Sequence, residues 1–141
     1  MTRDRLVKIL RLYGTVFAGI IIIIAFSILR PAAFATMGNL INITRQISLL
    51  VIIAIGATVV MSVEEFDLSV GAVASLGGVV AAKMAVAGVP IPLCFLTPVV
   101  VCFVLGYING FIVTKFRVLS FITTLAMGTI IGGFTFWFTG G

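Results

Sequence analysis

The hydrophobic residues of this chain form long runs separated by short polar stretches. A helix of about 20 apolar residues crosses a hydrocarbon core of about 30 Å, and each run is close to that length. The pattern therefore predicts an all-α, polytopic integral membrane protein with about five transmembrane helices. The predicted spans are residues 13–29, 46–63, 68–89, 93–114 and 118–141, after a basic amino-terminal segment over residues 1–12.

The third run is interrupted by a charge. Lys83 follows only fifteen uncharged residues, which make about 22 Å of helix and fall short of the hydrocarbon core. Two arrangements account for this. In one, Lys83 snorkels to the membrane surface from a helix that continues to Val89. In the other, the acidic turn before Leu68 dips into the membrane, and a short helix starts within it.

The stretches between the runs predict turns. Residues 30–45 carry proline, glycine and asparagine, and predict a loop with room for a short helix at the membrane surface. Pro90 and Pro92 predict a break between the third and fourth runs, whereas Pro98 is tolerated or kinks the fourth. Ala33-Phe34-Ala35 resembles a signal-peptide cleavage site, so a signal peptide is the alternative for the first run. The length of that run favours a span.

The composition agrees with a membrane protein. With 62% hydrophobic and 9% charged residues and a mean hydropathy of +1.36, the chain has too little polar surface for a soluble globule. The excess of nine basic over four acidic residues resembles a nucleic-acid-binding protein only if position is ignored. An amino terminus in the cytoplasm puts six basic residues inside (Arg3, Arg5, Lys8, Arg11, Lys115, Arg117) and three outside (Arg30, Arg45, Lys83). This bias predicts a cytoplasmic amino terminus, and the positions of the basic residues next to the apolar runs argue against a nucleic-acid partner.

The residue inventory argues against catalysis and cofactors. The chain has no histidine, and its two cysteines, Cys94 and Cys102, lie in one predicted helix at a spacing too long for a disulfide. Zinc binding and histidine-based catalysis are therefore excluded for this chain. The sequence also contains no GxxxxGK[ST] loop, so we expect no ATP, cofactor or metal site.

Three of the four acidic residues, Glu64, Glu65 and Asp67, gather between the second and third runs. An ionised group in hydrocarbon costs about 2.5–3.5 kcal/mol even on mild scales, so these groups must reach water or a partner. The simplest role for Asp67 is to cap the helix that follows. The functional alternative is that a helix interrupted at membrane depth offers Asp67 and Ser69 to a hydroxylated solute. We expect Glu64 and Glu65 to be solvated.

Small residues recur at spacings that allow close helix packing. Ser69, Gly71, Ser75 and Gly78 lie along the third run, and packing is the simplest explanation for them. Gly106 and Gly110 form a GxxxG pattern that also holds Asn109, whose amide needs a partner within a bundle. Residues 128–132 repeat the GxxxG spacing.

Two separated segments together resemble a known family. Residues 65–71, Glu-Phe-Asp-Leu-Ser-Val-Gly, are similar to the DLSVG signature of bacterial binding-protein-dependent ABC transporter permeases of the ribose and xylose type. Residues 109–114, 120–125 and 139–141 follow in the order found in that family. The likeness covers roughly residues 55–141. Leu119, Ala126 and Gly132 depart from the proline, glycine and arginine usual at these positions, which puts the packing of the last span in doubt.

The resemblance implies a function. It implies a permease subunit that moves a monosaccharide across the inner membrane, with Asp67, Ser69 and Asn109 as candidates for lining the path. Its implied partners are a second permease copy, a cytoplasmic ATP-binding subunit and a periplasmic sugar-binding protein. Family permeases have about twice as many spans, and the last run ends at Gly141 without a polar flank. We therefore expect the transmembrane domain, residues 13–141, to be incomplete at its carboxyl end and to match the amino-terminal half of a permease.

Other functions stay open from the sequence. A small oligomeric exporter or channel subunit would need a functional polar surface within these five spans. An intramembrane enzyme would have only a few carboxylates and lysines for its chemistry. A related permease for nucleosides or amino acids is the nearer alternative to a sugar permease.

Overall fold

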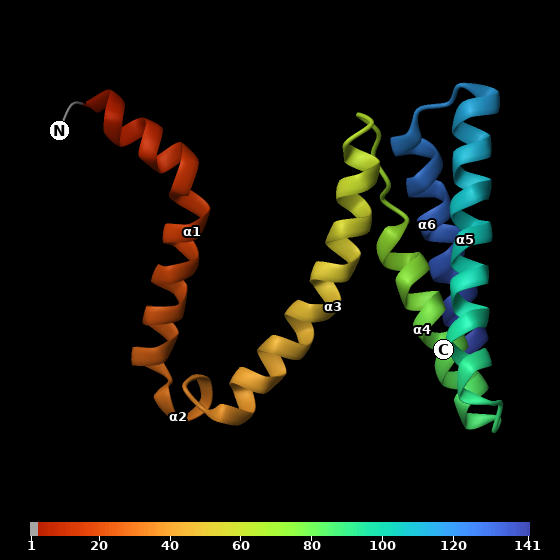
Figure 1. Ribbon diagram of the computed structural model, residues 1–141, viewed down its shortest axis with the longest axis horizontal. Helices are drawn as coiled ribbons and strands as arrows, with labels where there is room; N and C mark the ends of the chain where they lie inside the picture. Colours follow the sequence, from red (N-terminus) through yellow and green to blue (C-terminus); the bar gives the residue numbers. More distant parts are fainter. Residues whose placement is uncertain (1–2) are drawn as a thin grey trace. The chain divides into compact units, whose positions relative to one another are not determined.

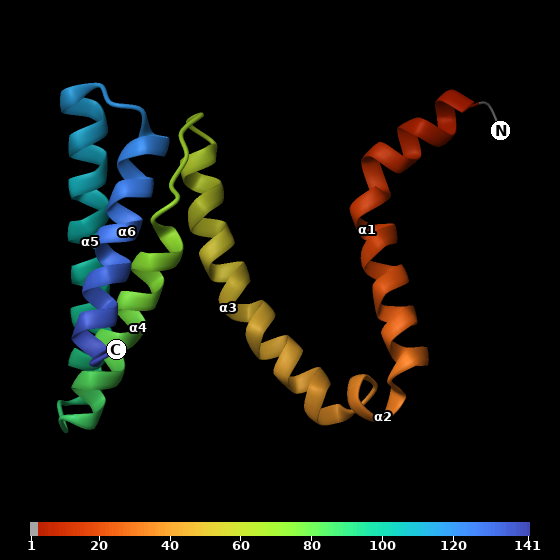
Figure 2. The ribbon, with the colours of Figure 1, turned by 180° about the vertical axis from the view of Figure 1, so that it is seen from behind.

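The protein is helical throughout its described part. The computed structural model describes the backbone of residues 3–141 and the side chains of residue 7 and residues 11–141, so the side chains of the predicted anchors Arg3, Arg5 and Lys8 lie outside it. The helices are α1 (Arg3–Leu29), α2 (Pro31–Phe34), α3 (Met37–Met61), α4 (Val70–Val86), α5 (Ile91–Phe116) and α6 (Ser120–Thr139) (Figures 1 and 2). Within the described residues, four helices are long and apolar enough to cross a membrane: α1, α3, α5 and α6. The predicted all-α, polytopic class is confirmed.

The chain divides into two compact units within α3, residues 1–49 and residues 50–141. In the first unit, the rings of Phe26 and Phe34 lie 5.7 Å apart between centroids and join the end of α1 to α2. The prediction of a loop over residues 30–45 is wrong for most of that stretch, because α3 already begins at Met37. Thr36 is the reason: its hydroxyl accepts a hydrogen bond from the amide of Asn39 at 3.2 Å and caps the helix.

The second unit contains a bundle of α4, α5 and α6, each of which contacts the other two. The α4–α5 crossing is close at Gly77, where a β-carbon would lie 3.0 Å from the sulfur of Cys102. Among the predicted packing residues of α4, Ser75 is exposed, and a β-carbon at Gly71 or Gly78 would meet nothing within 4 Å. Spacing alone did not identify which glycine faces the neighbouring helix.

Helix α4 has only 17 residues, or about 25 Å of helix. It ends before the predicted Val89 because Gly88 adopts a left-handed backbone with φ of 74°. The amides of Gly88 and Val89 then bond to the carbonyls of Ala85 and Met84, at 3.1 Å each, in a Schellman motif. The helix therefore stops ahead of Pro90. Helix α5, by contrast, continues through Pro98.

Lys83 is held by α6. Its ammonium group donates a hydrogen bond to the carbonyl of Phe138 and lies 4.2 Å from the centroid of the Phe138 ring. The amides of Gly140 and Gly141 bond to the carbonyls of Trp137 and Phe136 in the same turn. The last carbonyl groups of a helix have no partner within the helix, and Lys83 provides one for the carbonyl of Phe138. Its positive charge also lies at the negative end of the α6 dipole.

An extended segment, residues 65–69, runs from the turn at Glu64 to the start of α4. Its backbone is bonded to the beginning of α6. The amide of Phe66 donates to the hydroxyl of Ser120 at 3.2 Å, and the amide of Leu68 donates to the hydroxyl of Thr124 at 3.0 Å. Because these two hydroxyls lie one helical turn apart, the segment descends beside the first turns of α6. This geometry favours the arrangement in which a short α4 starts from within the membrane.

Gly128 allows the start of α4 to approach α6. A β-carbon at Gly128 would lie 3.4 Å from the α-carbon of Ser69 and 3.5 Å from the carbonyl oxygen of Leu68. Alanine fits at this distance, whereas a longer side chain would displace the backbone of the extended segment. Gly132, the second glycine of that GxxxG pattern, would meet nothing within 4 Å.

We predict that Gly128→Leu destabilises the folded protein by about 1–3 kcal/mol, because its side chain has no room against the backbone at Ser69. The measurement is the unfolding midpoint of the detergent-solubilised protein. Gly133→Leu is the matched control, since a β-carbon at Gly133 would meet nothing within 4 Å. Equal midpoints for the two variants would contradict the close contact at Gly128.

We also predict that Thr124→Val speeds hydrogen exchange at the amide of Leu68, because the variant removes the hydroxyl that accepts its bond. A hydrogen bond of this kind contributes about 0.5–1.5 kcal/mol. Mass spectrometry of the peptide over residues 63–69 measures the exchange. Thr124→Ser keeps the hydroxyl, so the amide of Leu68 should exchange at the same rate in this variant as in the unsubstituted protein. Unchanged protection in Thr124→Val would argue against the bond.

Candidate functional site

Asp67 lies in the extended segment just before α4. Its Oδ1 accepts hydrogen bonds from the amide of Ser69 at 2.8 Å and from the hydroxyl of Ser69 at 2.6 Å. The prediction that Asp67 caps the first turn of α4 is therefore wrong in detail. The helix begins at Val70, so Asp67 is too early in the chain and instead fixes Ser69, the residue at the cap position. The short bond to a charged acceptor is of the stronger kind.

Asn109 joins this pair from α5. Its Nδ2 donates to the hydroxyl oxygen of Ser69 at 2.9 Å, which confirms that the amide has a partner within the bundle. Ser69 is 0% exposed and Asn109 is 5% exposed. All three residues singled out from the sequence, Asp67, Ser69 and Asn109, therefore form one hydrogen-bonded chain from the extended segment to α5.

A cavity of about 260 Å³ lies beside this chain. Glu65 and Asp67 line it on the side of the extended segment, Ser120 and Thr124 on the side of α6, and Val60 at the end of α3. The α5 wall consists of residues 106, 109, 110, 113 and 114, whose spacing of three and four places them on one helical face. The site therefore combines two carboxylates, an amide and hydroxyl groups within a largely apolar surround.

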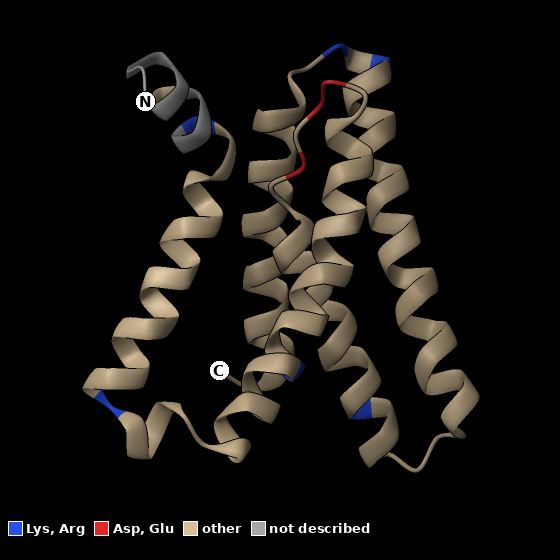
Figure 3. Cartoon of the chain, turned by 60° about the vertical axis from the view of Figure 1, so that its left-hand side comes forward, with Lys and Arg blue, Asp and Glu red and all other residues tan. Residues whose placement is uncertain are grey.

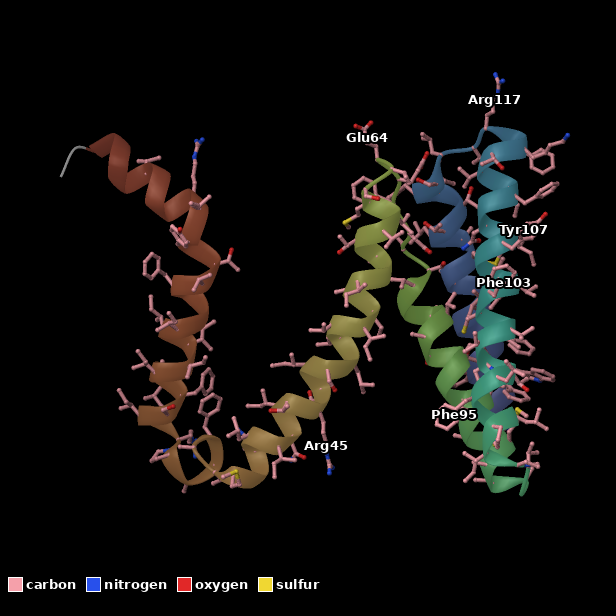
Figure 4. All side chains as sticks on the ribbon, viewed as in Figure 1. Arg45, Glu64, Phe95, Phe103, Tyr107 and Arg117 are labelled. Atoms are coloured by element: carbon pink, nitrogen blue, oxygen red, sulfur yellow. The ribbon has the colours of Figure 1, made fainter. Side chains whose placement is uncertain are left out.

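The acidic residues of the second unit lie at one end of the bundle. Glu64 and Arg117 both project away from the helices at this end (Figure 4), and the acidic segment continues from there toward α4 (Figure 3). Glu64 has a left-handed backbone with φ of 62° and belongs to the turn. Glu65 is exposed and also lines the cavity.

Two hydroxyl residues that bond to this site, Ser120 and Thr124, were not among the predicted site residues. They lie four apart and so share a face at the start of an apolar helix, which is a signal visible in the sequence. Gly106 and Gly110, which form the GxxxG pattern, line the cavity, and a β-carbon at either would meet nothing within 4 Å in the described part of the chain.

The chemistry that this arrangement offers is hydrogen bonding. Among the described residues, no three side chains of His, Cys, Asp or Glu gather in a way that could hold a metal ion. The carboxylates of Glu65 and Asp67 in the lining provide oxygens that accept hydrogen bonds from hydroxyl groups.

Comparison with known proteins gives the family. Residues 39–141 match the family described as the branched-chain amino acid transport system permease component. The chain is 39% identical to the ribose import permease of Haemophilus influenzae over 127 residues, 89% of this chain and 39% of that protein. It is 40% identical to the D-allose transport system permease of Escherichia coli over 124 residues, 87% of this chain and 38% of that protein.

A third relative is the galactose/methyl galactoside import permease of Escherichia coli, which is 32% identical over 132 residues, 85% of this chain and 39% of that protein. No solved structure matches the chain. The chain spans about two fifths of the length of the curated relatives it matches. It is therefore a member of the bacterial ABC transporter permease family that includes the ribose, allose and galactose import permeases.

Proposed function

We propose that this chain forms part of the membrane-spanning subunit of a binding-protein-dependent ABC importer for a monosaccharide in the bacterial inner membrane. The observation that carries the proposal is its identity of 39–40% to ribose and allose permeases over 87–89% of the chain. The cavity beside Asp67 and Asn109 supports the proposal, because its acceptor oxygens suit the hydroxyl groups of a sugar.

The other subunits of the importer are separate chains. Because the sequence has no GxxxxGK[ST] loop, ATP hydrolysis requires a separate cytoplasmic subunit. A periplasmic sugar-binding protein delivers the solute, and a second permease copy completes the path. We assign the transmembrane domain to residues 13–141, with α4 as the short third span.

A permease for amino acids is the second candidate, favoured by the description of the matching family. The cavity lining argues for a sugar instead. An amino acid carries an ammonium group as well as a carboxylate. The two carboxylates in the cavity wall suit the ammonium group, but the wall has no lysine or arginine to pair with the carboxylate of the amino acid. A neutral polyol needs no such cation.

We infer that the amino terminus lies in the cytoplasm. Six of the nine basic residues are on the cytoplasmic side in that orientation, in agreement with the positive-inside rule. The acidic segment, Lys115 and Arg117 then belong to the cytoplasmic half, and the turn between α4 and α5 belongs to the periplasmic side.

We predict that Asp67→Ala in the permease that contains this chain lowers the initial rate of sugar uptake about tenfold or more, since a hydrogen bond to a charged group contributes about 1.5–3 kcal/mol. Uptake of radiolabelled ribose, allose and galactose by cells measures the rate. The amount of permease in the membrane should be unchanged. Asp67→Asn keeps an acceptor oxygen and should be milder, and Glu64→Gln is the control outside the cavity. If Asp67→Ala takes up sugar at the same rate as the unsubstituted permease, Asp67 does not contribute to transport.

A second prediction concerns orientation. In a Cys94→Ala, Cys102→Ser background, Arg117→Cys should react with a membrane-impermeant maleimide only after spheroplasts are permeabilised. Val89→Cys should react in intact spheroplasts, because it lies at the opposite end of α5 in the turn after α4. The reverse pattern of labelling would place the amino terminus outside.

A further inference from the structure

Helix α5 carries a stripe of large exposed side chains. Leu96, Val100, Phe103 and Tyr107 follow one another at spacings of four, three and four residues, and each is at least half exposed. Phe103 and Tyr107 both project outward from α5 (Figure 4). Apolar residues that alternate between spacings of four and three are typical of two helices that pack along their length. These four residues, the α5 stripe, therefore have the spacing of a helix–helix contact.

Tyr107 lies deep in its span. The nearer charged end of α5 is marked by Lys115 and Arg117, which are eight and ten residues away, or about 12 and 15 Å along the helix. Side chains of a helix lean toward its amino-terminal end, so the hydroxyl group of Tyr107 leans away from that end and into the membrane. A tyrosine at the membrane surface keeps its hydroxyl group in water, but Tyr107 is too deep to do so.

A hydroxyl group in hydrocarbon needs a hydrogen-bond partner, and leaving it unpaired is costly. Threonine residues of the spans find this partner in their own helix. Thr114 donates to the carbonyl of Gly110, and Thr129 donates to the carbonyl of Ala126, at 2.7 Å each. The ring of Tyr107 instead carries its hydroxyl group away from the backbone, and the side chain is 66% exposed. Its partner must therefore come from protein that lies beside this face of α5.

The chemistry of the stripe suits a second copy of the same helix. A phenol hydroxyl group both donates and accepts, so two Tyr107 residues related by a two-fold axis can bond to each other. Residues 91–114 of α5 contain no charged side chain, so two copies of this face do not repel each other. A two-fold axis along the membrane normal keeps the two α5 helices parallel, and each stripe residue then meets its own counterpart.

We propose that the α5 stripe is the contact between two copies of the permease in the membrane, an inference that rests on the proposed importer function. The hydroxyl groups of the two Tyr107 residues pair within the membrane, while Val100 and Phe103 pack against their counterparts. None of the four stripe residues lines the cavity. The contact and the cavity thus use different residues of α5.

The test is disulfide cross-linking of single-cysteine variants of the complete permease in its native membrane, with Cys94→Ala and Cys102→Ser. A disulfide needs two α-carbons within about 7 Å of each other, so only positions at the contact can bridge two copies. After oxidation with copper phenanthroline, we expect Tyr107→Cys and Phe103→Cys each to give about tenfold more covalent dimer than control positions outside the stripe. The second position keeps the test valid if one of the two variants fails to fold.

Two matched controls are available. Ile108→Cys lies at nearly the depth of Tyr107 but about 100° around the same helix. Ile130→Cys lies in the middle of α6, where the native side chain is 65% exposed, almost the same as Tyr107. Equal cross-linking at the stripe and control positions would indicate random collision and would overturn the proposal.

Co-purification of two differently tagged copies measures separately whether the permease pairs at all. If the copies co-purify but neither stripe position cross-links, the proposal is overturned and the second copy of the importer remains, with α5 covered by another segment. If the copies neither co-purify nor cross-link, the second copy in the proposed function fails together with this contact.

Discussion

The structure depends on one constraint, the pairing of backbone amides in a segment that leaves the helix beside other transmembrane helices. Two amides of residues 65–69 take partners from α6, because Phe66 donates to Ser120 and Leu68 donates to Thr124. The amide of Ser69 donates to the carboxylate of Asp67 within the segment. Without these partners the chain would gain by extending α4 backward as a helix, since unpaired groups in hydrocarbon cost several kcal/mol each. The short α4 and the cavity beside it both follow from this pairing.

The best-buried side chains of the second unit are mostly polar. Among the described residues, the buried polar set is Ser69, Asn109, Ser120, Thr123, Thr124 and Thr135, against only three buried apolar side chains, Leu76, Cys94 and Ile131. In lipid, apolar burial between helices gains little because the acyl chains are equally apolar, and small and hydrogen-bonding residues define the contacts. Three of these six polar residues, Asn109, Ser120 and Thr124, also line the cavity.

The sequence was sufficient for the class of protein and for the residues with unusual chemistry. Apolar run lengths predicted the helical membrane fold, and the isolation of Asp67 and Asn109 in apolar surroundings drew attention to both. Helix ends were harder to predict, because α3 begins at a threonine cap and α4 stops at a left-handed Gly88, and both depend on local backbone geometry. Glycine spacing could not tell Gly128, which faces Ser69, from Gly106 and Gly110, which face a cavity. That distinction depends on how the helices are rotated against each other.

The bonds to α6 also impose an order on membrane insertion. Phe66 and Leu68 precede their partners Ser120 and Thr124 by 54 and 56 residues, so they leave the ribosome before those hydroxyls exist. Until α6 is made, the amides of Phe66 and Leu68 lack these partners. Ser120 and Thr124 also line the cavity, so its wall is complete only once α6 is in place.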